Sequence, residues 1–176
     1  MSSTRLPGKV LKEIAGKPML AWVVERARGA QTVSEVVVAT TVEPSDDPIV
    51  NFCAQMGYAC TRGSLNDVLD RYYQAARAYH ADVVVRVTAD CPLIDPAEID
   101  HVVREYQRSG VDFAANRLPP PFGRTYPIGL DTEVCSFAAL ERAWREAKEP
   151  YQREHVMPYL YEEPGRFKTL LVNHIP

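Results

Sequence analysis

The stretch Glu35-Val36-Val37-Val38-Ala39-Thr40 decides the fold that this sequence predicts. Three consecutive β-branched valines favour a strand, and an unbroken apolar run is typical of a parallel strand that is covered on both faces. A second run of this kind extends from Asp82 to Thr88 and has three valines of its own. Two such strands in one chain indicate a sheet that is buried between layers of helices.

Helical signals alternate with the expected strands along the chain. Asp95-Pro96, for example, suits the start of a helix that Gly110 can end. Strands separated by helices at these intervals predict parallel βαβ units, and hence a Rossmann-like three-layer α/β/α sandwich with a mainly parallel sheet. The expected helices are 17–29, 47–57, 65–79, 95–110, 136–148 and 151–162, and the expected strands are 35–40, 58–61, 82–88, 111–115, 130–135 and 167–172.

Residues 116–127 interrupt this alternation. Three consecutive prolines, Pro119-Pro120-Pro121, together with Gly123 and Pro127, cannot maintain a helix or a central strand. We therefore expect an extended arm here, and a plain surface loop is the simplest form that it can take.

Composition limits the classes of function. The 176 residues suffice for one domain with a sizeable core, and the formal net charge of -3 argues against a general nucleic-acid binder. No apolar run approaches the length that spans a bilayer. The four cysteines are widely separated and form no C-x-x-C pair, so free thiols in a reducing cytoplasm are expected.

The turn Ser3-Thr4-Arg5-Leu6-Pro7-Gly8-Lys9 has the composition of a phosphate-binding loop. Pro7 fixes one φ angle and Gly8 permits close approach of the backbone, so Arg5 and Lys9 can meet phosphate oxygens beside unpaired N–H groups. Arginine supplies a planar fork for two oxygens, and lysine a compact charge. Taken alone, the pattern fits a solvated basic turn equally well.

The segment that opens with this turn, 3–20, resembles the phosphate-binding opening of the cytidylyltransferases that activate sugars as CMP-sugars. The resemblance is greatest to the spore-coat polysaccharide protein F type and extends to the CMP-KDO synthetase type. Ile14 stands where sialate-activating relatives carry a second lysine, which argues against a sialate-specific enzyme. Further similar segments follow in the family's order, at 36–41, 63–72, 88–95 and 153–159.

The resemblance implies a Mg²⁺-dependent enzyme that transfers CMP from CTP to a sugar and releases pyrophosphate. It assigns catalytic roles to Arg5, Lys9 and Asp90, and makes Asp90 the metal ligand. Asp90 also follows the apolar run 82–88, and open α/β sheets bind ligands at the carboxyl ends of their strands. A turn or helix-cap aspartate is the alternative for this residue.

The resemblance also implies further binding residues. Asp67 is equally suited to cap the helix that follows it. Surface or interface polarity is the alternative for the sugar candidates, and His155 is at least as well suited to hydrogen bonding in a dimer or in the core. The nucleotide contacts are expected at Ser3, Thr4, Arg5, Gly8, Lys9, Ser64, Asn66 and Asp67, and the sugar contacts at Arg117, Asp131, Glu133 and His155.

We expect one cytidylyltransferase-like domain over residues 1–176, acting in the cytoplasm as a homodimer. Relatives place an apolar strand directly before Ser3, and a second metal-binding carboxylate after the last strand, so this domain is expected to lack both segments. The alternatives left open are transfer of a different nucleotide and a non-catalytic domain that binds a nucleotide or a sugar.

Overall fold

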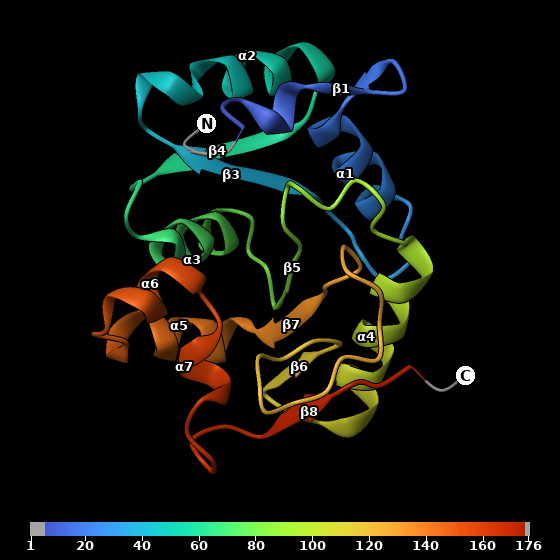
Figure 1. Ribbon diagram of the computed structural model, residues 1–176. Helices are drawn as coiled ribbons and strands as arrows, with labels where there is room; N and C mark the ends of the chain where they lie inside the picture. Colours follow the sequence, from blue (N-terminus) through green and yellow to red (C-terminus); the bar gives the residue numbers. More distant parts are fainter. Residues whose placement is uncertain (1–5, 175–176) are drawn as a thin grey trace.

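Both valine runs form strands at the expected places, β3 (Val37–Thr41) and β5 (Val83–Arg86) (Figure 1). The computed structural model describes residues 6–174. The other strands are β1 (Glu13–Ile14), β2 (Lys17–Pro18), β4 (Ala59–Gly63), β6 (Phe113–Ala115), β7 (Glu133–Ser136) and β8 (Thr169–Leu171).

Three helices, α3, α4 and α5, begin directly after a capping residue. Asp67, Asp95 and Ser136 each accept a hydrogen bond from a backbone N–H of the first turn, at 2.9, 2.9 and 3.0 Å. Two short 3-10 helices are η1 (Lys9–Leu11) and η2 (Pro44–Asp46). The α-helices are α1 (Met19–Arg28), α2 (Asp47–Met56), α3 (Val68–Ala78), α4 (Pro96–Ser109), α5 (Phe137–Glu146), α6 (Pro150–His155) and α7 (Pro158–Tyr161).

The strands form two larger sheets instead of one. Strands β3 and β4 pair in parallel, with Val37 opposite Ala59. A four-stranded sheet has the order β5-β7-β6-β8, in which β6 and β8 are parallel and β7 is antiparallel to both of its neighbours. The strands β1 and β2 form a separate small hairpin.

The four-stranded sheet has helices on both faces (Figure 1). On one face, Phe113 and Cys135 pack with buried residues of α3, α5 and α7. On the other, Ala114 and Val134 pack with α1 and α4. Because neighbouring residues of a strand point to opposite faces, this alternation establishes helix, sheet and helix layers and confirms the predicted α/β/α class.

The direction of β7 differs from the expected parallel sheet. No helix or strand lies between the end of β6 at Ala115 and the start of β7 at Glu133. An antiparallel neighbour needs no helical crossover, whereas a parallel one does. Asn116 joins the two ends of this segment, since its amide donates to the carbonyl of Leu130 and accepts from the N–H of Thr132, both at 2.8 Å.

The single helix expected over 151–162 was wrong, because the structure has α6 and α7 in its place. Val156 takes a φ of 73°, a left-handed conformation that ends α6. Pro158 then begins α7, because a proline lacks the N–H that a continuous helix needs.

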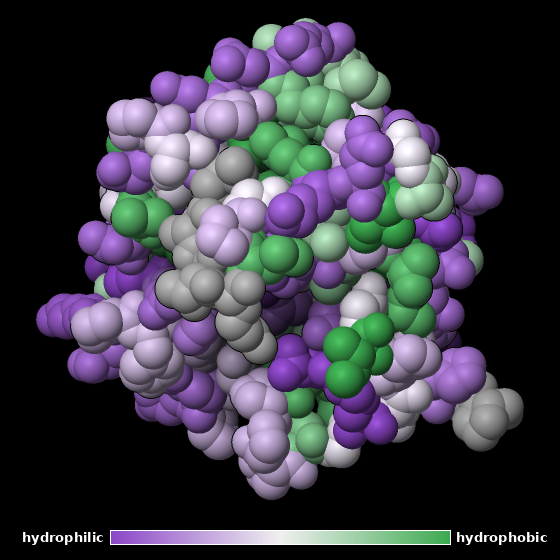
Figure 2. Space-filling view, turned by 45° about the horizontal axis from the view of Figure 1, so that its top comes forward, coloured by the Kyte–Doolittle hydropathy of each residue, from purple (hydrophilic) through white to green (hydrophobic). Residues whose placement is uncertain are grey.

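Hydrophilic side chains predominate on the face shown in Figure 2, and hydrophobic side chains form smaller separate groups there. Within residues 6–174, none of the helices combines the length and the apolar character needed to cross a bilayer.

Candidate active site

The turn near the amino end and the carboxylate at mid-chain meet in the structure. The Lys9 ammonium donates to Asp90 Oδ2 at 2.6 Å, and the two side chains are 32% and 45% exposed. The hydrogen bond from Lys9, together with Thr88, holds the pKa of Asp90 below its usual value, although burial acts in the opposite direction. A lysine and an ionised aspartate that solvent can reach are therefore placed side by side.

Tight local turns fix both members of this pair. Gly8 has a φ of 67°, and its carbonyl accepts from the N–H of Leu11 at 3.0 Å. Glycine enters this left-handed region at little cost, so the chain can turn just before Lys9. On the other side, the N–H of Cys91 donates to the carbonyl of Thr88 at 3.1 Å, which closes a turn around Asp90 directly after β5.

The expected nucleoside-binding turn, Ser64 to Asp67, follows the carboxyl end of β4. The Ser64 hydroxyl accepts from the N–H of Asn66 at 3.2 Å, and both side chains lie in an exposed segment. Asp67 acts as the cap of α3, and its carboxylate also accepts from Arg153 Nη2 at 2.6 Å and Nε at 3.0 Å. Asp67 therefore serves as a helix cap, its nucleotide contact stays a prediction, and Ser64 and Asn66 are the more exposed groups of the turn.

Three of the sugar-binding candidates form one charged cluster. Asp131 pairs with Arg117 and Arg124, each at 3.2 Å, and Glu133 on β7 pairs with Arg86 on β5. Burial raises the pKa of Glu133, the Arg86 guanidinium opposes this rise, and Asp131 and Arg117 also act on it. The charges of this cluster are thus close enough to influence one another.

The pKa of Cys91 responds to charges from both the cluster and the Lys9–Asp90 pair. Burial raises the pKa of the Cys91 thiol, and the charges of Asp90, Asp131 and Lys9 act on it as well. The charged cluster therefore lies within electrostatic reach of the residues around Asp90. This arrangement suits a site in which an acceptor approaches a bound triphosphate.

His155 is the described candidate that is not brought into this arrangement. Ser3, Thr4 and Arg5 lie outside the described residues. His155 ends α6 with an exposed side chain, and no hydrogen bond or ion pair among residues 6–174 joins it to Asp90 or Asp131.

Arg71 and Arg124 are two cations that the sequence analysis did not single out. No ion pair of Arg71 is found within the described range, its Nε is buried without a hydrogen-bond partner, and desolvation lowers its pKa. The one signal for Arg71 in the sequence is its place in the family-like segment 63–72, one helical turn after Asp67. Arg124 is recognisable only through its contact with Asp131.

Asp90 fits a magnesium ion better than a transition metal. Across residues 6–174, no group of three or more His, Cys, Asp and Glu side chains is placed to hold a metal. Mg²⁺ commonly takes only one or two carboxylates and completes its shell with water and substrate phosphates. A single accessible carboxylate beside a lysine matches that donor set.

The comparison with protein families decides the assignment. The family model described as cytidylyltransferase matches residues 1–176. The chain belongs to the cytidylyltransferase family. This membership confirms the resemblance on which the assignment of Lys9 and Asp90 rests.

Individual cytidylyltransferase relatives are longer than this chain. A solved cytidylyltransferase from Leptospira borgpetersenii is 36% identical with a TM-score of 0.88, and the match covers 99% of this chain and 72% of that one. An uncharacterised protein of Methanocaldococcus jannaschii is 40% identical over 95% of this chain, which spans 66% of its length. The spore coat polysaccharide biosynthesis protein SpsF of Bacillus subtilis is 30% identical over 96% of this chain and 70% of its own length.

Curated 3-deoxy-manno-octulosonate cytidylyltransferases of several bacteria match a smaller part, 57–68% of this chain and 39–48% of their own length. Both types that the sequence resembles are therefore among its relatives. The SpsF type matches over more of the chain.

Proposed function

We propose that this chain contributes the CTP-binding part of an enzyme that transfers CMP from CTP to a sugar for surface polysaccharide or glycan biosynthesis, with release of pyrophosphate. The observation that carries the proposal is the 2.6 Å contact between Lys9 and Asp90. It joins two residues 81 positions apart in sequence, the cation that we propose binds phosphate and the carboxylate that we propose binds the metal. Family membership supports CTP as the nucleotide.

The side chains act by position and charge. A sugar hydroxyl attacks the α-phosphorus of CTP, and pyrophosphate leaves, so preorganised cations near the triphosphate stabilise the transition state. When the triphosphate binds, we expect the Lys9 ammonium to move from Asp90 to phosphate oxygens, which frees the carboxylate for a cation. Asp90 would hold Mg²⁺, which neutralises triphosphate charge when bound. Arg5 remains a predicted second phosphate ligand.

The charged cluster of Arg117, Arg124, Asp131, Glu133 and Arg86 is the proposed acceptor side of the site. Its mixed charges offer donors and acceptors to sugar hydroxyls, and its guanidinium groups offer partners to an acidic sugar.

A cytoplasmic homodimer is part of the same proposal. In support of the dimer, Ile128 beside the arm is 87% exposed, and light scattering tests the mass in solution.

The decisive test is the substitution Asp90→Asn, which keeps the shape of the side chain and removes its charge. We expect pyrophosphate release from CTP, with Mg²⁺ and a panel of sugars, to fall about 10²- to 10³-fold, by analogy with the loss of one preorganised charge. Asp95→Asn is the matched control, because asparagine caps helices as well as aspartate does and Asp95 serves as a cap. Undiminished activity of Asp90→Asn would refute the metal assignment.

The same assay separates the alternatives. Release of pyrophosphate from UTP, GTP or ATP in place of CTP would indicate a different nucleotidyltransferase. Calorimetric binding of CTP without turnover of any acidic or amino sugar would instead support a non-catalytic binding domain.

A further inference from the structure

Arg153 of α6 joins two segments that are distant in sequence. Its Nε donates to both carboxylate oxygens of Asp67, at 3.1 and 3.0 Å, and its Nη2 donates to Oδ2 at 2.6 Å. Its Nη1 donates to the carbonyl of Trp144 at 2.6 Å. All three nitrogens of one guanidinium group are therefore engaged, which fixes the plane of that group and the carboxylate that it holds.

The Arg153–Asp67 pair is mostly shielded from water. The side chain of Arg153 is 20% exposed, and that of Asp67 is 29% exposed. Exposed ion pairs contribute little because water and salt screen them, whereas a partly buried pair with several hydrogen bonds is screened less. A lysine could not replace this arginine, because an ammonium group lacks the planar fork. The contact is therefore more rigid than an ordinary surface ion pair.

Asp67 is the last residue of the turn in which we expect the nucleoside contacts. This turn, 64–67, lies between the end of β4 at Gly63 and the start of α3. Gly63 is held by the ladder to β3, where it lies opposite Thr41. Asp67 is held by Arg153 at the other end. A four-residue segment that is fixed at both ends has few conformations left to it.

A second set of contacts runs from α5 to the same end of α3. The indole N–H of Trp144 donates to Asp70 Oδ1 at 2.8 Å, and its ring stacks on Tyr73 with the centroids 4.1 Å apart. The backbone N–H of Asp70 donates to Asp67 Oδ1 at 2.9 Å. Because Arg153 also binds the carbonyl of Trp144, these contacts form one connected network around the first turn of α3.

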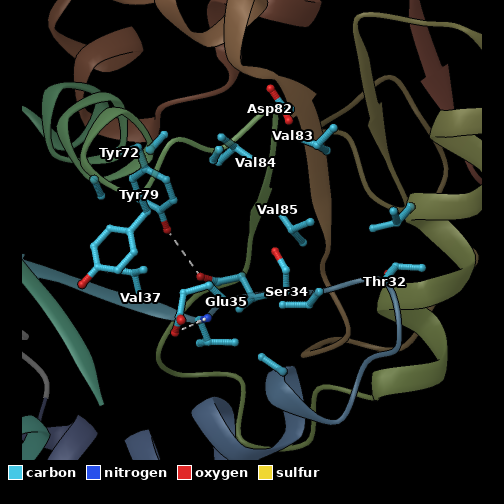
Figure 3. A pocket seen from close by; sticks show the side chains of 18 of the residues that line it. Thr32, Ser34, Glu35, Val37, Tyr72, Tyr79, Asp82, Val83, Val84 and Val85 are labelled. Carbon is cyan, nitrogen blue, oxygen red and sulfur yellow. Dashed lines mark hydrogen bonds between the residues drawn. The ribbon is translucent and has the colours of Figure 1, made fainter. Parts of the chain in front are cut away.

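Another side of α3 borders a cavity of about 430 Å³. Tyr72, Ala76 and Tyr79 are among the residues that line it, and Figure 3 shows Tyr72 and Tyr79 on the helix beside it. A cavity supplies fewer packing contacts than a filled interior. The contacts with α5 and α6 therefore have a larger share in fixing the position of α3 and of the turn that precedes it.

We propose that Arg153 is a positioning residue for nucleotide binding. Through Asp67, its guanidinium group holds the turn 64–67 in the conformation that receives the nucleoside half of the nucleoside triphosphate, while Lys9 and Asp90 serve the phosphate half. This inference rests on the proposed function, because it takes the turn as the nucleoside contact. Arg153 itself does not touch the substrate; it reduces the conformational entropy that the turn loses when the nucleoside binds.

A positioning role has a kinetic signature. The turn holds the nucleoside equally before and during the reaction, so loosening it weakens the binding of CTP and leaves the chemical step unchanged. We expect Arg153→Met to raise the KM for CTP about tenfold and to keep kcat within about twofold, whereas Asp90→Asn should lower kcat. Arg145→Met is the matched control, because it removes an arginine from an exposed ion pair with Glu141 and should change neither constant.

Calorimetry separates the two halves of the nucleotide without catalysis. Arg153→Met should weaken the binding of CTP about tenfold and leave the binding of pyrophosphate unchanged, each measured with Mg²⁺. Equal losses for both ligands would indicate a general structural defect and overturn the positioning role. CTP binding of equal strength by the unchanged chain and the variant would refute the role of Arg153 alone. Failure of the unchanged chain to bind CTP would refute the proposed function as well.

Amide hydrogen exchange examines the turn with no ligand present. Exchange of the Asp70 N–H, which the Asp67 carboxylate accepts, should become about tenfold faster in Arg153→Met, and exchange in β6 should stay the same. An unchanged rate at Asp70 would contradict the proposal.

Arg153→Lys provides a second variant if Arg153→Met does not fold. It keeps the positive charge and loses the fork, so it should raise the KM for CTP about threefold with kcat unchanged. A KM equal to that of the unchanged chain would show that charge alone suffices, and would overturn the role of the fork.

Discussion

Strands β6 and β5 both contain a run of apolar residues, yet residues of the two runs differ in burial. Phe113, Ala114 and Ala115 of β6 are each 0% exposed, and β6 has a neighbour on both edges. Val83 of β5 is 37% exposed, and among residues 6–174 β5 has one neighbouring strand. The comparison shows that an apolar run specifies a strand, whereas the elements that pack around the strand determine how deeply each side chain is buried.

The energetic consequence follows from this difference. Truncation of Phe113 removes packing contacts on every side of the ring, whereas an exposed valine such as Val83 already contacts solvent. Substitutions at the centre of the four-stranded sheet should therefore lower the free energy of unfolding strongly, and equivalent substitutions at Val83 should lower it little. Four predictions bear on this gradient and on the charge pair of β5 and β7.

Phe113→Ala should have the largest effect. Removal of a fully buried ring leaves a cavity in the packing between β6 and the α3, α5 and α7 side, and should lower the free energy of unfolding by about 4 kcal/mol. Urea unfolding followed by circular dichroism measures the change. Phe122→Ala in the arm is the matched control, since Phe122 is 48% exposed and should lose less than about 1 kcal/mol.

The edge of β5 that pairs with β7 should also be sensitive to substitution, because Arg86 on β5 neutralises the charge of Glu133 on β7. Both side chains are mostly buried, at 19% and 18% exposure. Arg86→Met leaves an unpaired carboxylate and should cost about 3 kcal/mol near neutral pH. Arg86→Met combined with Glu133→Leu should recover most of this loss, and failure to recover would mean that the Arg86 side chain acts chiefly through packing.

The Arg86→Met variant should also respond to pH in a defined direction. Burial already raises the pKa of Glu133, and loss of Arg86 removes the main opposing influence. The folded state then binds more protons than the unfolded state between the ordinary glutamate pKa and the raised one. Stability should therefore fall as pH rises through that window and return on acidification. A flat profile from pH 4 to pH 8 would contradict this account.

Much of the fold could be predicted because its signals are local. The valine runs placed β3 and β5, and Asp95 and Ser136 cap their helices as expected. The direction of β7 and the open edges of β3 and β5 could not be predicted, because they depend on which strands become neighbours. The break at Val156 was visible only in part, through Pro158.

The site was predictable to a similar extent. Family resemblance placed Lys9 and Asp90 together, and the structure joins them at 2.6 Å. The pairing of Arg153 with Asp67, 86 residues apart, depends on the packing of α6 against α3, which no local pattern reveals. The unpaired state of Arg71 is likewise a property of the folded surroundings and not of its sequence neighbours.

The smallest expected effect gives the sharpest test, because one substitution can be made in both regions. Val134→Thr places a hydroxyl at a fully buried position of β7 and should cost about 2 kcal/mol. Val83→Thr makes the same change at the start of β5, where water reaches the side chain, and should cost at most about 0.5 kcal/mol. Thermal unfolding of both variants measures the difference. Equal losses would show that water does not reach Val83 in solution, and would contradict the difference in burial between the two positions.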